Sequence, residues 1–174
     1  MSPLTATSVG VIGQLLVAAQ AMARSRGAIK VGLPFVDDEG RDLEIHLAGL
    51  FKSSLSLQVK TSAVLQRRGK LRLLKMTFIL PRANQVDDPH FWYLFAFLDL
   101  ESVQLADWVF LVPSKIVHSR CARGTDGEPI FYFQASMEEG AHDQWTRFRI
   151  RPEYLGERLV ALLRDRSNFE GVAA

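Results

Sequence analysis

Apolar residues recur at helical spacing near both ends of the chain. Over residues 9–26 they predict a helix with one apolar face, formed by Val11, Leu15, Ala18, Ala19 and Met22. Ser8 suits the N-cap of this helix and Gly27 the position after its end. Near the other end, Pro152 suits a first helical turn, and a leucine stripe that runs to about Arg166 predicts a second helix: Leu155, Leu159, Leu162 and Leu163.

Between the helices the pattern changes to a period of two, which is typical of strands. Residues 28–33 predict a short strand and 37–40 a turn, and residues 41–47 and 55–60 then alternate as a hairpin. We expect the connection of this hairpin to contain Gly49, Ser53 and Ser54. Later aromatic and β-branched runs predict strands at 91–100, 107–113, 129–136 and 146–150. Residues 61–80 fit a helix or a strand, and we favour a loop followed by a strand near 71–79.

The order of these elements is helix, strand meander, further strands and helix, which predicts an α+β fold. The chain has 174 residues, the usual size of one domain, so we expect a single domain over 1–174. The chain has one cysteine, Cys121, which excludes an internal disulfide framework and a cysteine-rich zinc site.

No segment predicts a membrane span or a cleaved signal. The longest apolar run, 91–98, is far shorter than the roughly 18 residues that a span needs. The apolar N-terminal region has no positive charge before it, so we interpret it as an ordinary amphipathic helix. We therefore expect a cytoplasmic protein that does not bind membranes.

The first hairpin carries the candidate chemistry. Residues two apart on a strand share a face, so Asp42 and Glu44 point together, as do Gln58 and Lys60. Both strands bury their aliphatic side in the same core, so we expect the two polar faces to coincide. Asp42, Gln58 and the carbonyl of Val59 then offer oxygen ligands for Mg²⁺ or Mn²⁺. A lysine beside such a metal can orient an attacking water and stabilise charge on a phosphate.

These residues resemble the PD-(D/E)xK nuclease superfamily, whose fold is restriction-endonuclease-like. The resemblance covers about residues 8–62 and rests on Gly40-Arg41-Asp42-Leu43 and on the strand 57–62. It implies a core of a helix, a three-stranded meander, a helix and a fourth strand, with Asp42 as the metal-binding acid. Gln58-Val59-Lys60 matches the (D/E)xK step in the QxK form that a subgroup carries, and Gln14 falls where many members have an acid. Glu44 could compensate for the missing carboxylates.

Charge is distributed unevenly along the chain. The formal net charge is only +2, yet residues 60–86 contain seven basic side chains and no acid. Within this stretch Arg67, Arg68, Lys70 and Arg72 are candidates for binding the phosphates of DNA. A solvated loop and strand edge would show the same pattern. Arg147, Arg149 and Arg151 alternate and could extend the basic surface.

Three functions fit the sequence. The first is a metal-dependent nuclease that hydrolyses DNA phosphodiesters through Asp42, Gln58 and Lys60. The second is a non-catalytic member of the same fold that binds nucleic acid or protein. The third is a structural module whose aromatic strands form a homodimer interface.

Overall fold

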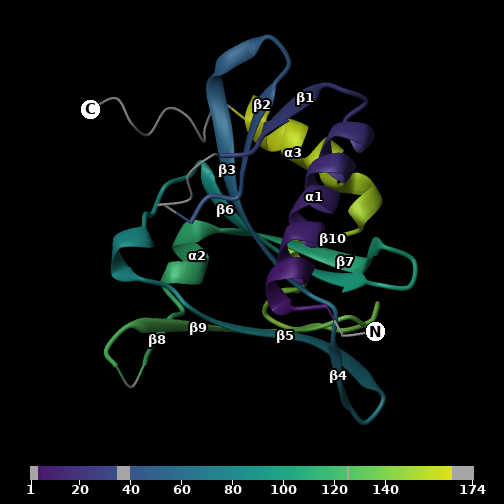
Figure 1. Cartoon of the computed structure of the whole chain (residues 1–174), viewed down its shortest axis with the longest axis vertical. Helices are drawn as coiled ribbons and strands as arrows, with labels where there is room; N and C mark the ends of the chain where they lie inside the picture. The colour runs from purple at the N-terminus through teal and green to yellow at the C-terminus, as the bar shows by residue number, and fades with distance from the viewer. Residues whose placement is uncertain (1–3, 35–39, 125, 166–174) are drawn as a thin grey trace.

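The computed structural model describes residues 4–34, 40–124 and 126–165, which form two β-sheets and three α-helices (Figure 1). Sheet A has the strand order β1-β2-β3-β6-β7-β10 and sheet B the order β4-β5-β9-β8. The strands of sheet A are β1 (Ile29–Gly32), β2 (Leu43–Leu47), β3 (Leu50–Ser62), β6 (Phe91–Asp99), β7 (Gln104–Pro113) and β10 (Arg149–Ile150). Those of sheet B are β4 (Leu65–Arg68), β5 (Leu71–Ile79), β8 (Ala122–Arg123) and β9 (Pro129–Ser136). The helices are α1 (Ala6–Arg24), α2 (Ser114–His118) and α3 (Leu155–Arg164), with 3-10 turns η1 (Arg82–Asn84), η2 (Thr146–Phe148) and η3 (Pro152–Tyr154).

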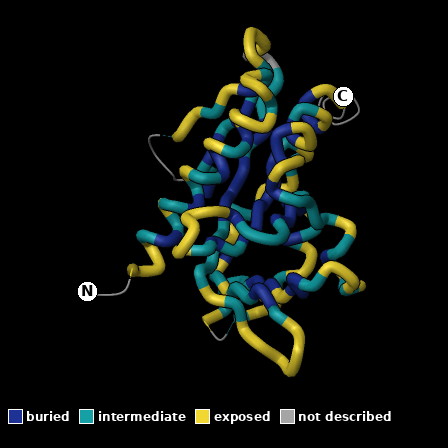
Figure 2. Tube along the Cα trace, turned by 90° about the vertical axis from the view of Figure 1, so that its right-hand side faces the viewer, coloured by how far each residue is buried: buried dark blue, intermediate teal, exposed yellow. Residues whose placement is uncertain are grey.

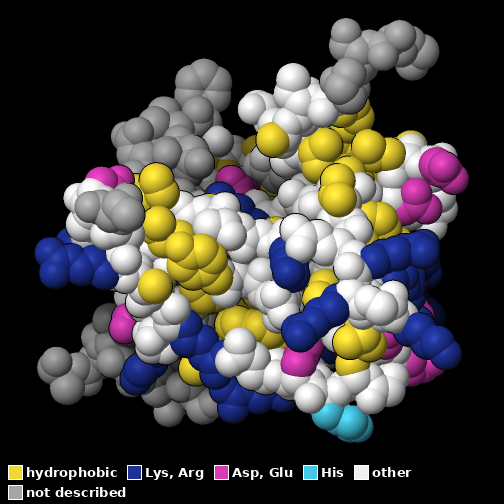
Figure 3. Space-filling view, turned by 90° about the horizontal axis from the view of Figure 1, so that it is seen from below, with side chains coloured by type: hydrophobic (Ala, Val, Ile, Leu, Met, Phe, Trp, Pro, Cys, Tyr) yellow, Lys and Arg dark blue, Asp and Glu magenta, His cyan; other side chains and the backbone are white. Residues whose placement is uncertain are grey.

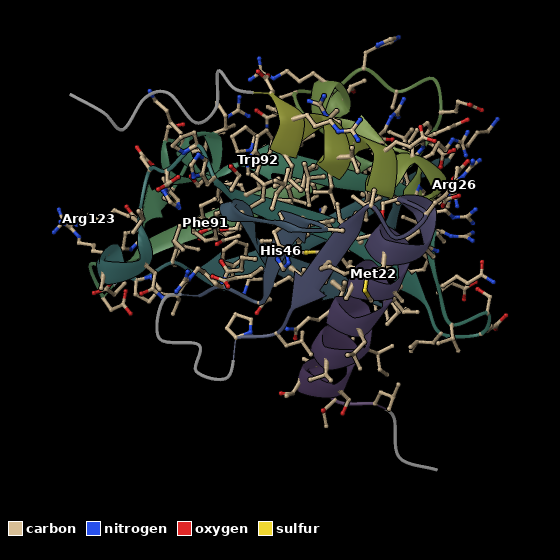
Figure 4. All side chains as sticks on the ribbon, turned by 90° about the horizontal axis from the view of Figure 1, so that it is seen from above. Met22, Arg26, His46, Phe91, Trp92 and Arg123 are labelled. Atoms are coloured by element: carbon tan, nitrogen blue, oxygen red, sulfur yellow. The ribbon has the colours of Figure 1, made fainter. Side chains whose placement is uncertain are left out.

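The elements stack in layers around sheet A. Helices α1 and α3 lie over one face, where they bury aliphatic side chains of β2, β3, β6 and β7 (Figure 4). Sheet B and α2 pack against the other face of β6 and β7 through an aromatic core. In that core the rings of Phe95 and Phe133 stack at 4.2 Å and Trp145 is fully buried. Each such ring contributes about 1.5–3 kcal/mol by leaving water, so these contacts hold the two sheets together.

Helix α1 buries a different face from the one that the periodicity indicated. Thr5, and not Ser8, caps it, since the Thr5 hydroxyl accepts from the Ser8 amide at 3.1 Å. The buried positions are Val9, Gly13, Val17, Ala18 and Ala21, whereas Val11, Leu15 and Met22 are exposed (Met22 is labelled in Figure 4). The helix carries no charge before Arg24, so its apolar residues extend around most of its circumference and periodicity could not identify the packed side.

Within the described ranges, α1 is also the one helix long and apolar enough to cross a membrane. Buried core helices and signal sequences have the same property. Here the helix packs with its small residues against β3 and α3. Gly156 of α3 allows that approach, because a Cβ there would collide with the backbone of Arg24 and Ser25.

The predicted hairpin is confirmed, with a tighter turn than expected. Strands β2 and β3 pair antiparallel with Leu43 opposite Leu57 and Ile45 opposite Leu55. The turn is Ala48-Gly49, and Ser53 and Ser54 belong to β3 and not to the connection. Gly49 adopts a φ of +80°, which favours glycine. The predicted turn at 37–40 lies outside the described residues except for Gly40.

The path from β3 to β6 differs from the expected helix crossover. The two strands are parallel, with Lys60 opposite Phe95, so the chain must cross over between them. Within residues 63–90, all of them described, the crossover contains β4, β5 and the short η1 and no α-helix. The prediction of a helix at this point, which the resemblance implied, is therefore wrong. The antiparallel pair β4 and β5 occupies this part of the chain. The strand predicted near 71–79 is confirmed as β5.

The predicted strand at 146–150 is mostly wrong. Residues Thr146–Phe148 form the 3-10 turn η2, and only Arg149–Ile150 pair with β7. Arg149 and Arg151 place their guanidinium groups 4.1 Å from the centre of the Trp108 ring. These two arginines cover an aromatic side chain and are not members of one alternating strand with Arg147.

Candidate functional site

The three residues predicted for catalysis lie on one face of the β2–β3 hairpin. Asp42 directly precedes β2, and extending the β2–β3 register by one position puts it opposite Gln58. Gln58 and Lys60 share a face of β3 because they are two residues apart. Their face is the one that turns toward sheet B, since the Lys60 ammonium lies 5.2 Å from the centre of the Phe78 ring. The coincidence of the two polar faces is therefore as predicted.

Asp42 is fixed at the point where the β2 ladder ends. Its backbone amide donates to the carbonyl of Leu57 at 2.9 Å, and its Oδ2 accepts from the Val59 amide at 2.6 Å. The Gln14 side chain of α1 donates to the Asp42 carbonyl at 2.6 Å. Gln14 therefore lies beside Asp42 and positions its backbone.

A cleft opens where sheet B leaves β3 uncovered. It has a volume of about 500 Å³ and lies between the first turns of α1, the end of β3 and the edge of β5. Asp42, Lys60 and Gln14 line it, together with Lys75 on β5. We call it the Lys60 cleft. Beyond Leu74, β5 pairs with β9 on one side only, so its other edge forms the wall of this cleft.

Gln58 stands behind this cleft and not on its wall. The residue is 8% exposed, and its Oε1 is a buried atom with no hydrogen-bond partner. Gly40 covers it with a φ of +70°, and a Cβ on Gly40 would lie 3.0 Å from the Gln58 Nε2. A buried carbonyl oxygen without a hydrogen-bond donor destabilises the fold. This atom is therefore available to accept a hydrogen bond or to coordinate a cation.

The oxygen donors at this position fit a hard divalent cation that is held weakly. They are the Asp42 carboxylate and the Gln58 amide oxygen, and Mg²⁺ is commonly bound through one or two carboxylates and substrate phosphates. Among the residues that the structure describes, no group of three or more His, Cys, Asp and Glu could hold a metal.

Glu44 is not brought to the Lys60 cleft. It shares a strand face with Asp42, but its Oε1 pairs with the Arg41 guanidinium at 3.1 Å. It is not among the residues that line the cleft. Compensation for the missing carboxylates by Glu44 has no geometric support in this arrangement.

The predicted phosphate-binding residues surround the turn between β4 and β5. Arg67, Arg68 and Lys70 are exposed. Arg72 differs, because its guanidinium bonds Asp107 at 2.9 Å and Glu138 at 3.0 Å. The hydrogen bond to Arg72 lowers the pKa of the Glu138 carboxyl, and the same bond raises the pKa of Arg72. Arg72 therefore anchors the base of this hairpin with a charge that is already paired.

Sequence reasoning singled out neither Lys75 nor Asn84 as part of the site. Lys75 lay within the acid-free stretch 60–86, so charge pattern alone gave a weak signal for it. Asn84 of η1 lies near Gly40 and Gln58, and a Cβ on Gly40 would be 3.4 Å from its Nδ2. Only the crossover through sheet B brings Asn84 to this position, and no local pattern indicates it.

A separate polar cluster joins the segment after η1 to α2. The Tyr93 hydroxyl lies 3.1 Å from His118 Nε2, and His118 Nδ1 lies 2.8 Å from Asp87 Oδ1. Burial raises the pKa of Tyr93, so this phenol remains protonated. Ser114 donates to the Asp88 carbonyl at 3.1 Å and does not pair with His118 as a nucleophile would.

Comparisons with known proteins bear on the fold. No protein-family model matches the sequence, and a search of curated proteins finds no match. The solved structure of a bacterial homing endonuclease, I-Ssp6803I, matches with a TM-score of 0.54 and 14% sequence identity. The match covers 91% of this chain and 97% of that chain. The fold is restriction-endonuclease-like. This agrees with the α+β arrangement expected from the sequence, and at this identity the similarity shows the fold alone.

Proposed function

We propose that this protein hydrolyses phosphodiester bonds of DNA with a divalent metal ion. The observation that carries the proposal is the convergence of Asp42, Gln58 and Lys60 on one hairpin face beside an open cleft. The restriction-endonuclease-like fold and the nuclease named in the structural comparison support it. Location in the cytoplasm is part of the same proposal.

Each residue has a distinct task in this proposal. The Asp42 carboxylate and the Gln58 Oε1 would hold Mg²⁺ or Mn²⁺, which when bound polarises a phosphoryl oxygen and lowers the pKa of water. Lys60 lines the cleft, and its ammonium can stabilise the extra negative charge that develops on the phosphate. Gln14 holds the Asp42 backbone and so keeps the carboxylate in place.

The test is cleavage of supercoiled plasmid by the purified full-length chain in Mg²⁺ and in Mn²⁺. We expect nicked or linear product, and we expect Lys60→Met to lower the rate by about 100-fold or more, because one charge-stabilising donor is removed. Methionine keeps an unbranched stem against Phe78, so the fold should persist. The matched control is Lys30→Met, which changes an exposed lysine of β1 outside the cleft.

One observation favours a non-catalytic DNA-binding protein as the second candidate. The candidate metal site has a single carboxylate, Asp42, since Gln58 and Gln14 stand at two positions where the resembled nucleases carry acids. Binding of duplex DNA at low salt without cleavage in either metal would favour this candidate. If the protein neither cleaves nor binds DNA, both proposals fail and the dimerisation module remains.

A further inference from the structure

The β4–β5 hairpin projects from the body of the molecule beside the Lys60 cleft. Strand β4 is the edge of sheet B and pairs with β5 alone, over Leu65–Arg68. All residues from 66 to 71 are exposed, and the hairpin extends at the lower right of Figure 1 and at the bottom of Figure 2. A short exposed hairpin adds little to the core, so its sequence is free to serve another purpose.

One side of this hairpin carries an amide and a guanidinium in line with the cleft. Gln66 is opposite Leu73 and Arg68 is opposite Leu71, so both share a face with Lys75, which lines the cleft. The side chains of Gln66, Arg68 and Lys75 make no hydrogen bond or ion pair with any residue that the structure describes. The hairpin projects toward the lower surface of the molecule, and the view from below shows several Lys and Arg side chains on that surface (Figures 1 and 3).

We propose that the β4–β5 hairpin reads base sequence in the major groove of duplex DNA, with Arg68 and Gln66 as the contacting residues. The inference rests on the proposed function, because it takes a DNA duplex to occupy the Lys60 cleft. The major groove is about 12 Å wide and admits a two-stranded β-ribbon. Arginine can bond O6 and N7 of guanine with two donors, and glutamine can bond N6 and N7 of adenine.

The other side of the hairpin has a different role. Arg67 is opposite Arg72, on the face that continues into the aromatic core through Leu74. A side chain on that face points away from the base edges that Gln66 and Arg68 reach. Arg67 therefore contacts phosphates, which adds affinity without sequence preference. This contrast supplies a matched pair of arginines on one hairpin.

The strand geometry fixes where the contacted bases lie. Leu71, opposite Arg68, is four residues from Lys75, and four residues of antiparallel strand span roughly 14 Å. With a rise of about 3.4 Å for each base pair, that length corresponds to about four base pairs. Gln66 is opposite Leu73 and lies at half that distance. The preference should therefore fall about two to four base pairs from the phosphate held in the cleft.

The experiment selects duplexes from a randomised library with the full-length protein in Ca²⁺ or EDTA, and sequences the bound fraction. We expect a preference for guanine at one position and adenine at another. Arg68→Ala should relax the guanine position by about 5- to 150-fold in discrimination, the range for one bidentate contact. Arg67→Ala should weaken binding to all sequences alike, and Arg164→Ala, an exposed arginine of α3, should change neither quantity.

The outcomes separate the two proposals. Absence of any duplex binding at low salt overturns the proposed function, and with it this inference. Binding without sequence preference, or a preference that Arg68→Ala and Gln66→Ala leave intact, overturns the inference and leaves the proposed function standing. A preference that Arg67→Ala alone removes would also contradict the assignment of faces.

Discussion

Replacing Gln58 by methionine should make the protein more stable and less able to bind metal. The Gln58 Oε1 is buried without a partner, and such an atom costs about 1–3 kcal/mol. Methionine has an unbranched stem of similar length to that of glutamine and replaces the amide with apolar atoms, so the free energy of unfolding should rise by about that amount. For a chain of this size, the melting temperature should rise by about 2–10 °C in EDTA.

The metal response should change in the opposite direction. For a wild-type Kd on the order of 1 mM, typical of divalent-cation sites with few charged ligands, 10 mM Mg²⁺ stabilises by about 1.4 kcal/mol. If loss of the amide oxygen weakens Mg²⁺ binding tenfold, the stabilisation by 10 mM Mg²⁺ falls to about 0.4 kcal/mol. Thermal unfolding followed by circular dichroism, with and without Mg²⁺, measures both the change in stability in EDTA and the stabilisation by Mg²⁺.

The same thermal unfolding experiment includes a control variant and can contradict the prediction for Gln58→Met. Gln134→Met changes an exposed glutamine of β9 and should move the unfolding free energy by no more than about 0.5 kcal/mol. A Gln58→Met protein that melts below the wild type in EDTA would refute the argument from the orphaned oxygen. Equal stabilisation of both proteins by Mg²⁺ would refute Gln58 as a metal ligand.

Three further predictions follow from backbone and charge. Gly40→Ala should lower the free energy of unfolding by about 1–2 kcal/mol and also impair cleavage, because its Cβ presses on Gln58. Gly127→Ala is the control: Gly127 has a φ of +87° and open space around it, so its substitution should lower stability by a similar amount and leave cleavage intact. Gly13→Ala should lower the melting temperature by forcing α1 away from Thr61, while Gly10→Ala, with nothing near its Cβ, should raise it. Glu138→Gln should destabilise at neutral pH, and urea unfolding should show the difference from wild type shrinking as the pH falls below about 5. The reason is that the stabilisation from the lowered pKa of Glu138 is fully present above the unfolded pKa of about 4.3 and is lost as the pH falls through the folded pKa.

The sequence predicted what local periodicity determines. The β2–β3 hairpin follows from alternation, and so does the common face of Asp42, Gln58 and Lys60, while strand β9 follows from its aromatic and β-branched run. The packed side of α1 did not follow, because a helix without charge up to Arg24 offers no polar face as a reference. The prediction of a strand at 146–150 was mostly wrong because Thr146–Phe148 form a 3-10 turn directly after the buried Trp145. That turn depends on tertiary packing, which alternation does not indicate.

Long-range contacts account for what was missed at the site. The burial of Gln58 depends on Gly40 and Asn84, which lie 18 and 26 residues away in the chain. The charge of Arg72 is paired with Asp107 and Glu138, 35 and 66 residues away. Composition marked Arg72 as one basic residue among seven, and only the fold distinguishes this anchoring arginine from the exposed arginines of the same hairpin.

The crossover through sheet B links the candidate site to the hairpin that would read DNA. The segment that makes β3 and β6 parallel neighbours also contains β4 and β5, so Lys60 and the hairpin are joined by one continuous stretch of chain. Arg72 fixes the hairpin base to β7 through Asp107, whose φ of +58° lies beside an irregularity in the β6–β7 register. Such irregularities redirect side chains, and this one directs a carboxylate toward sheet B. The position of the hairpin relative to the Lys60 cleft is therefore set by folded structure, so a protein that cuts and reads DNA as proposed should keep a fixed spacing between the cut bond and the contacted bases.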